Sequence, residues 1–229
     1  MNRKIKLSAS IMCANLLNLE EDLEILGQKQ IDYLHFDIMD GHFVPGVGLG
    51  IFLLEQLTRK QSIPVETHLM VTDPERYIDE LSQAGTALIS FHYETGKDIS
   101  HILQEIKNRK IGAGLALNPG TKVAVLEPYL DLLDTVLLMA YAPGIRNQVA
   151  SPNFGEKVQN LMELLSKHEK QNIDIAVDGG LTEELIAIYR RCGANFFILG
   201  SSVLFKPATH LDEQIDRLRS ILDGRLEHG

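Results

Sequence analysis

Two histidines and two aspartates stand where apolar, strand-like runs end. His35 and Asp37 are two residues apart in "HFDIMDGHFVP", so in an extended chain both side chains point to the same face. His68 lies in "ETHLM" and Asp178 in "AVDGG", each at the end of another apolar run. Imidazole and carboxylate groups together suit zinc, manganese or iron(II). The four side chains are therefore candidate ligands of one divalent metal ion, provided that the fold brings them together.

The elements that would carry these residues alternate regularly along the chain. β-rich runs predict eight strands, and amphipathic stretches after them predict eight helices. The predicted strands are residues 6–12, 33–39, 65–70, 87–92, 112–117, 135–140, 173–177 and 195–199; the predicted helices are 19–29, 50–60, 74–83, 98–109, 123–130, 154–170, 183–191 and 211–222. Asp73 and Thr182 are candidate N-caps. Strand–helix alternation without a linker predicts an α/β fold, one (β/α)8 TIM barrel spanning residues 1–229 as a single domain.

Function in such a barrel is carried at the carboxyl ends of the strands. Each polar residue there also has an ordinary explanation, because one histidine at a strand end is more often a structural residue than a ligand. An aspartate before Gly-Gly usually forms a turn, and Asp40 is expected to shape the Asp-Gly turn that follows it. The convergence of four ligand-type side chains from three strands favours the metal site over these separate explanations.

Composition limits the classes of partner and compartment. The formal net charge of −9 disfavours nucleic acid or an anionic membrane as a partner, because both require a basic face. The two cysteines, Cys13 and Cys192, are far apart and have no metal-like spacing, which is typical of a reduced, cytoplasmic chain. The first ten residues lack the apolar segment of a signal peptide, and no apolar run reaches membrane-spanning length.

The chain resembles the ribulose-phosphate 3-epimerase family over nearly its whole length. The resemblance rests on "SASIMCANL", "HFDIMDGHFVP", "THLMV", "FHYE", "LNPGT", "MAYAPG", "VDGG" and "LGSSVLF", in family order. It implies an isomerase of carbohydrate (pentose phosphate) metabolism that acts on a small ketose phosphate. It also implies one divalent metal per chain, zinc first and manganese, iron(II) or cobalt as alternatives, and a homodimer or homohexamer.

The resemblance also implies roles for individual residues. The metal ligands would be His35, Asp37, His68 and Asp178, and the two aspartates would be the acid–base pair. Ser10 and His68 would contact substrate, and a cap over the enediolate would come from Met39, Met70 and Met139. The alternative for each methionine is that it fills an irregular barrel top. His92 and Glu94 could orient a ligand, and Asn118 could equally brace the "LNPG" turn.

The chemistry of 3-epimerisation explains why these residue types would be needed. A proton must leave the carbon beside a ketone, and positive charge from a metal would stabilise the enediolate that forms. Inversion then requires one acid–base group on each face of the flat intermediate. Asp37 and Asp178 come from well-separated strands, so they can flank a sugar between them.

Two regions are expected to bind the phosphate. Glycine-rich turns after strands seven and eight of a barrel commonly hold phosphate through backbone N–H groups, and here they offer Gly179, Gly180, Gly200 and Ser201. The loop after strand six departs from the family pattern Pro-Gly-Phe-Gly-Gly-Gln, and its candidate substrate-binding residues are Gly144, Ile145, Arg146 and Asn147. Arg146 could supply a bidentate phosphate contact or could point into solvent.

Just before that loop, Tyr141 and Ala142 replace a small apolar residue and a polar one. These departures leave the substrate open. D-Ribulose 5-phosphate, converted to D-xylulose 5-phosphate, is the first expectation, and another ketose phosphate such as D-allulose 6-phosphate is the second. A phosphosugar-binding barrel without turnover is the third, although a pure binder needs no base on both faces. A related decarboxylase or aldolase would need Asp-x-Lys on strand three, and "ETHLMV" lacks the lysine.

Overall fold

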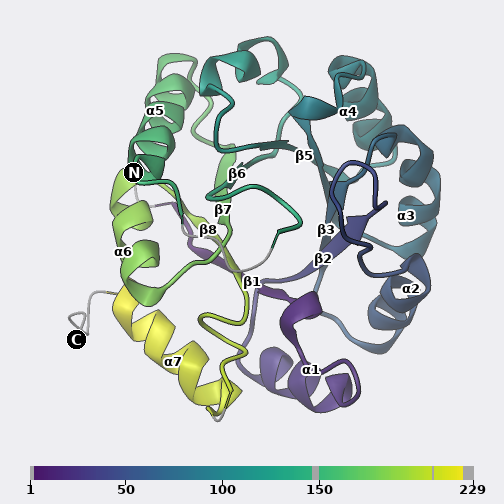
Figure 1. Cartoon of the computed structure of the whole chain (residues 1–229), viewed down its shortest axis with the longest axis vertical. Coiled ribbons are helices and arrows are strands. Elements are labelled where there is room, and N and C mark those ends of the chain that lie inside the picture. Colours follow the sequence, from purple (N-terminus) through teal and green to yellow (C-terminus); the bar gives the residue numbers. More distant parts are fainter. Residues whose placement is uncertain (1–2, 146–149, 208, 224–229) are drawn as a thin grey trace.

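A computed structural model describes residues 3–145, 150–207 and 209–223, and within them eight parallel strands close into one barrel in chain order (Figure 1). The strands are β1 Lys6–Ser10, β2 Tyr33–Met39, β3 Val65–Met70, β4 Leu88–His92, β5 Gly112–Leu117, β6 Thr135–Met139, β7 Asp174–Asp178 and β8 Phe196–Leu199. β1 pairs with β8 as well as with β2, which closes the ring. The predicted TIM barrel is confirmed.

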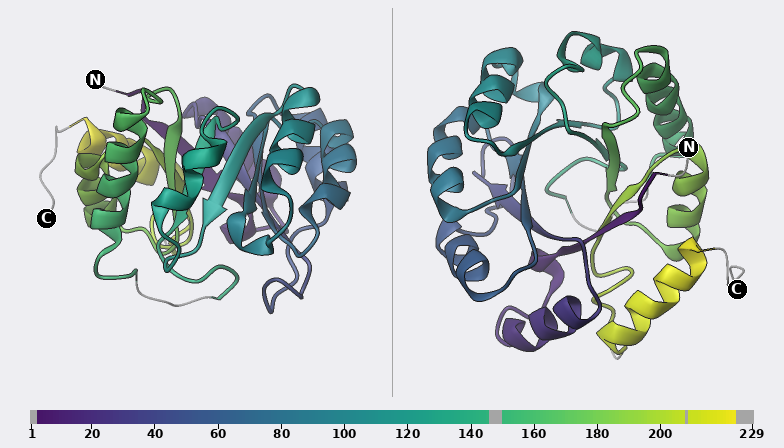
Figure 2. Two further views of the ribbon diagram at one scale, coloured as in Figure 1. Left: turned by 90° about the horizontal axis from the view of Figure 1, so that it is seen from above. Right: turned by 180° about the vertical axis from the view of Figure 1, so that it is seen from behind.

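Helices surround the barrel, as both ends of the molecule show (Figures 1 and 2). The α-helices are α1 Leu19–Gln28, α2 Ile51–Lys60, α3 Ile78–Ala84, α4 Ile99–Asn108, α5 Phe154–Lys167, α6 Glu183–Cys192 and α7 Leu211–Leu222; short 3-10 helices are η1 Ile11–Cys13, η2 Pro74–Tyr77, η3 Tyr93–Thr95 and η4 Val123–Tyr129. Their apolar faces bury a continuous core against the outward-pointing side chains of the strands, among them Phe36, Leu69 and Phe91. That burial is the main force that holds the strand ends in register.

Three details differ from the sequence-based expectation. The predicted helix 74–83 is divided into the 3-10 helix η2 and the α-helix α3. The predicted helix 123–130 is the 3-10 helix η4, because Pro128 lies inside it and cannot donate the backbone hydrogen bond that an α-helix requires. Asp73 makes no side-chain cap and forms an ion pair with Lys97 instead. Thr182 does cap α6, accepting a hydrogen bond from the Leu185 N–H at 3.2 Å. In the part of the chain described, no helix has the length and apolarity to cross a membrane.

Strand register decides which side chains meet inside the barrel. Ser10 is level with His35 on the neighbouring strand, Asp37 is level with His68, and Met139 is level with Asp178. Because successive side chains alternate between the two faces of a strand, the inward-pointing residues form layers along the barrel axis. The polar candidates therefore share the layers nearest the carboxyl ends of the strands.

The opposite end of the barrel interior is closed by an ion pair and two rings. Lys6 Nζ lies 2.5 Å from Asp174 Oδ2 and 5.6 Å and 5.8 Å from the ring centroids of Tyr33 and Phe196. The rings themselves lie 5.2 Å apart. This packed floor leaves the carboxyl-terminal mouth as the end where a ligand can reach the polar layers.

Candidate active site

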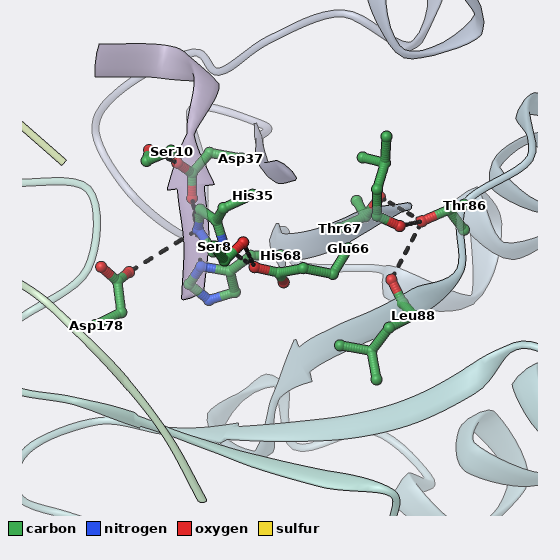
Figure 3. Close-up of polar contacts among 11 residues, drawn as sticks. Ser8, Ser10, His35, Asp37, Glu66, Thr67, His68, Thr86, Leu88 and Asp178 are labelled. Carbon is green, nitrogen blue, oxygen red and sulfur yellow. Dashed lines mark hydrogen bonds and ion pairs between the residues drawn. The ribbon is translucent and has the colours of Figure 1, made fainter. Parts of the chain in front are cut away.

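His35, Asp37, His68 and Asp178 converge at the mouth of the barrel, from β2, β3 and β7 (Figure 3). His35 Nε2 lies 3.0 Å from Asp37 Oδ1 and 4.0 Å from Asp178 Oδ2, and His68 Nδ1 lies 3.3 Å from Asp37 Oδ1. One ligand atom each from His35, His68 and Asp178 fall within 4.8 Å of one another, so this cluster could hold a metal ion. The two histidines are fully buried, whereas the side chain of Asp178 keeps 21% of its surface exposed.

Glu66 fixes the orientation of His35. Its Oε1 lies 2.5 Å from His35 Nδ1 and also accepts a hydrogen bond from Ser8 Oγ at 2.9 Å, all inside the barrel. A neutral His35 that donates its Nδ1–H to this carboxylate presents the lone pair of Nε2 to Asp37 and Asp178. Sequence reasoning missed Glu66. Its spacing of two residues from His68, in a fully buried strand, was the signal that could have identified it.

A second chain of hydrogen bonds orients His68. His68 Nε2 lies 2.9 Å from His92 Nε2, and His92 Nδ1 lies 3.2 Å from Glu94 Oε2. Burial lowers the pKa of His92 to about 4, so its ring is neutral and can donate Nδ1–H to Glu94 while its Nε2 accepts from His68. His68 Nδ1 is then left with a lone pair, and this buried atom has no hydrogen-bond partner among the described residues.

Glu94 is in turn held by backbone and side-chain donors. Its Oε1 accepts a hydrogen bond from the Asn118 N–H at 2.8 Å and another from the Thr121 hydroxyl. Burial acts to raise the pKa of Glu94, but the hydrogen bonds from His92, Thr121 and Asn118 outweigh it and lower that pKa to about 2. Asn118 therefore braces this chain through its main-chain N–H.

The electrostatics of the cluster favour a bound cation. Burial acts to lower the pKa of His35, but the carboxylates of Asp37 and Glu66 outweigh it and raise that pKa well above its ordinary value. The pKa of Asp37 is held far below its usual range, because His35 and His68 overcome the effect of burial. A divalent ion that replaces the proton on His35 Nε2 would meet two imidazole nitrogens and two carboxylates facing one point, the donor set that such an ion requires.

The other residues predicted at the mouth lie around this cluster. Ser10 Oγ is 3.5 Å from Asp37 Oδ2, and Met39, Met70 and Met139 end β2, β3 and β6. Met139 packs with an apolar cluster inside the barrel that includes Phe196 and Ile198. Asp40 forms the predicted turn: its carboxylate accepts hydrogen bonds from the backbone of His42, Phe43 and Thr72.

The predicted phosphate-binding residues also border the mouth. Gly179 and Gly180 have φ values of +111° and +58°, a backbone conformation that other residues rarely adopt, and Gly200 and Ser201 follow β8. Residues 140–145, which follow β6, extend from the same end of the barrel as the β2–α2 loop (Figure 2, left). A Cβ on Gly144 would lie 2.5 Å from Val44 Cβ, so these two loops meet. Ile145 is half exposed, whereas Arg146 and Asn147 lie outside the described residues.

Comparison with known proteins identifies the family. Residues 6–204 match the model of the ribulose-phosphate 3 epimerase family. The chain belongs to this family. Ribulose-phosphate 3-epimerase of Bacillus subtilis is 34% identical over 199 residues (87% of this chain, 92% of that protein), and that of Buchnera aphidicola subsp. Acyrthosiphon pisum is 36% identical over 204 residues (89% of each). The cytoplasmic isoform of Oryza sativa is 33% identical over 223 residues (96% and 95%). Family membership makes the chain an isomerase, an epimerase acting on carbohydrates.

Solved structures of other families share the barrel. KGPDC from Streptococcus mutans superimposes with a TM-score of 0.73 at 12% identity, over 96% of this chain and 98% of that one. Phosphoribosyl anthranilate isomerase from Thermus thermophilus gives 0.68 at 13% identity, over 97% and 100%. At this level of identity the likeness concerns the fold alone.

Proposed function

We propose that the protein catalyses the metal-dependent 3-epimerisation of a ketose phosphate, D-ribulose 5-phosphate to D-xylulose 5-phosphate, by two-base proton transfer through an enediolate. The observation that carries this proposal is the placement of Asp37 and Asp178. They come from β2 and β7 and approach the same atom, His35 Nε2, to 3.0 Å and 4.0 Å. Two carboxylates on separate strands can face a flat intermediate from both sides, which inversion at one carbon requires.

His35, Asp37, His68 and Asp178 would hold the metal. Their donor atoms fit a divalent ion: two imidazole lone pairs are turned inward by Glu66 and His92, and one of them, on His68 Nδ1, is buried without a hydrogen-bond partner among the described residues. When bound, the ion would supply positive charge that stabilises the developing enediolate. Zinc is the first expectation, and manganese, iron(II) and cobalt accept the same donors.

The opposite pKa shifts of the two aspartates support opposite roles in two-base chemistry. The imidazoles of His35 and His68 overcome burial and keep Asp37 ionised, so it can accept the proton from C3. Burial is the main cause of the raised pKa of Asp178; His35 opposes it and the charge of Asp37 adds to it, and the net shift favours the protonated form of this carboxyl for the opposite face. In the reverse reaction the two aspartates exchange these roles. One proton is removed from C3 and one is returned to it, so atoms and charge balance.

The surroundings suit an enediolate and a phosphate. Met39, Met70 and Met139 would cover the flat intermediate with apolar, polarisable surface and exclude water. Ser10 would contact the sugar, and the N–H groups of Gly179, Gly180, Gly200 and Ser201 would hold the phosphate. Gly144 and Ile145 belong to a loop that meets Val44 of the β2–α2 loop, and this supports a covering role.

The experiment that tests this function is hydrogen exchange at C3. A panel of four-, five- and six-carbon ketose phosphates is incubated with the metal-loaded protein in deuterated water, and loss of the C3–H signal and appearance of the epimer are followed by NMR. We expect exchange and inversion together, with D-ribulose 5-phosphate among the substrates. A protein that binds these sugars but exchanges no C3 hydrogen would be a phosphosugar-binding barrel, and the proposal would be wrong.

We also propose that the enzyme works in the cytoplasm as a homo-oligomer. The rice relative is named a cytoplasmic isoform, and the formal net charge of −9 disfavours nucleic acid and anionic membranes as partners. Gel filtration with light scattering tests the oligomeric state: a monomer at micromolar concentration would contradict it.

A further inference from the structure

A helix outside the barrel contacts the hydrogen-bonded chain that orients His68. Lys157 lies near the start of α5, in the outer ring of helices (Figure 1). Its Nζ lies 2.5 Å from the carbonyl oxygen of Asn118 and 3.2 Å from that of Pro119, in the turn that follows β5. An ammonium that donates two charge-assisted hydrogen bonds to one turn holds that turn in place.

The same turn holds the carboxylate of Glu94. Its Oε1 accepts a hydrogen bond from the Asn118 N–H at 2.8 Å and another from the Thr121 hydroxyl. The Thr121 N–H donates to the Asn118 carbonyl at 3.1 Å, so both donors belong to one closed turn. Burial lowers the pKa of Lys157 to about 8 and Glu94 acts to raise it, so the side chain is still mostly a cation at neutral pH. Lys157 therefore holds the carbonyl side of the turn, and Glu94 accepts from its donor side.

The place of the Glu94 carboxylate decides the tautomers of two buried histidines. Its Oε2 lies 3.2 Å from His92 Nδ1, and His92 Nε2 lies 2.9 Å from His68 Nε2. While Glu94 accepts the Nδ1–H of His92, the proton between the two rings belongs to His68 Nε2, and His68 Nδ1 keeps a lone pair. If Glu94 moves away, His92 can carry its proton on Nε2 instead. His68 then carries its own proton on Nδ1, the nitrogen that would face the metal.

We propose that Lys157 and Thr121 are positioning residues for the metal. They act through Glu94 and His92, and they keep the lone pair of His68 Nδ1 directed at the ion. This inference rests on the proposed metal-dependent function, but it concerns metal affinity, which can be measured without any substrate.

The test measures the dissociation constant for zinc by competition with a chromophoric chelator. Lys157→Met and Thr121→Val should each raise that constant about tenfold, as expected for the loss of a partner that orients a metal ligand. When each is combined with His92→Phe, the further increase should be no more than about twofold, because the chain to His68 is already broken. Lys167→Met, exposed on the same helix, and Thr209→Val, exposed before α7, are the matched controls and should leave zinc affinity unchanged.

The outcomes separate this inference from the proposed function. Unchanged zinc affinity in Lys157→Met or Thr121→Val overturns the role of that residue. Effects that add in full to that of His92→Phe overturn it as well, because they would arise from a loosened fold and not through His92. Either result leaves epimerisation standing. Zinc affinities that change as expected, in a protein that exchanges no C3 hydrogen, would support the positioning role and overturn the function. If circular dichroism shows that Lys157→Met does not fold, the cycle of Thr121→Val with His92→Phe decides the inference.

Discussion

His68 and His92 meet through their Nε2 atoms, 2.9 Å apart, in the buried interior of the barrel. Only one of the two nitrogens can carry the shared proton, and the contact of His92 Nδ1 with Glu94 assigns it to His68. A residue that would not touch a metal thus determines which nitrogen of His68 has a lone pair. Histidine ligands in proteins are commonly oriented in this way, by a partner of their second ring nitrogen.

His92→Phe should therefore weaken metal binding. Phenylalanine cannot accept the His68 Nε2–H, so the ring of His68 loses its fixed tautomer and orientation. We expect the dissociation constant for zinc to rise about 10–100-fold, the range typical of losing such a partner, measured by competition with a chromophoric chelator. His101→Phe, on the exposed side of α4, is the control. Unchanged zinc affinity in His92→Phe would show that His68 does not need this hydrogen bond.

The aspartates should be separable by isotope exchange. Asp37→Asn and Asp178→Asn should each abolish epimerisation, because each removes the acid–base group from one face of the intermediate. One of the two variants can still exchange the C3 hydrogen of one epimer, since a single base suffices for one face. NMR in deuterated water, with each epimer as the starting sugar, measures both rates. Near-normal turnover in either variant would show that the two-base assignment is wrong.

Removal of the metal should abolish activity and lower stability. Exhaustive chelation should stop turnover, and zinc, manganese, cobalt or iron(II) should restore it. A ligand that binds only the folded state raises the apparent Tm, so titration of the chelated protein with zinc should raise Tm and saturate at one ion per chain. His35→Ala should lose this increase, and His210→Ala, an exposed histidine before α7, should keep it. Full activity of a preparation shown to be free of metal would contradict the proposal.

Much of the fold followed from the sequence because local patterns and tertiary structure agree. The bounds of β2, β3 and β5 coincide with the predicted strands, and other strand ends differ by one or two residues. Helix 123–130 was an exception, since its apolar pattern indicated a helix while Pro128 prevents α-helical hydrogen bonding. The polar side chains at the strand ends were predicted to converge because parallel strands in a closed barrel direct their carboxyl ends to one mouth.

The partners of those side chains were harder to predict. Glu66 and its contact with His35 depend on the register between β2 and β3, which short sequence patterns do not specify. The same holds for the packing of Tyr141 on Gly179, residues that are far apart in sequence. The burial of Lys157, in contrast, has a local signal in the sequence. Lys157 lies three residues after Phe154 and four before Leu161, both buried on the inner face of α5, so helical spacing places it on the same face.

Lys157 gives the last prediction, which concerns stability and pH. Its ammonium donates to the carbonyls of Asn118 and Pro119 at 2.5 Å and 3.2 Å, and burial lowers its pKa from 10.5 to about 8, against the raising effect of Glu94. In the unfolded chain the ordinary pKa returns, so between about pH 8 and 10.5 the unfolded state binds more protons than the folded state. The free energy of unfolding therefore rises as the pH increases from about 8 to about 10.5. This gain is complete above about pH 10.5 and is lost as the pH falls through about 8.

Comparison with Lys157→Met isolates this effect from other groups that titrate in the same range. The free energy of unfolding of the native protein, relative to Lys157→Met, should rise as the pH increases from about 7.5 to about 10, measured by urea denaturation at each pH. Methionine preserves the apolar length of the side chain and removes the titrating amine. Lys167→Met, an exposed position on the same helix, is the control and should give a difference that does not change with pH. A flat difference for Lys157→Met as well would show that the buried ammonium costs the folded state nothing, because its two carbonyl partners fully replace the water it lost.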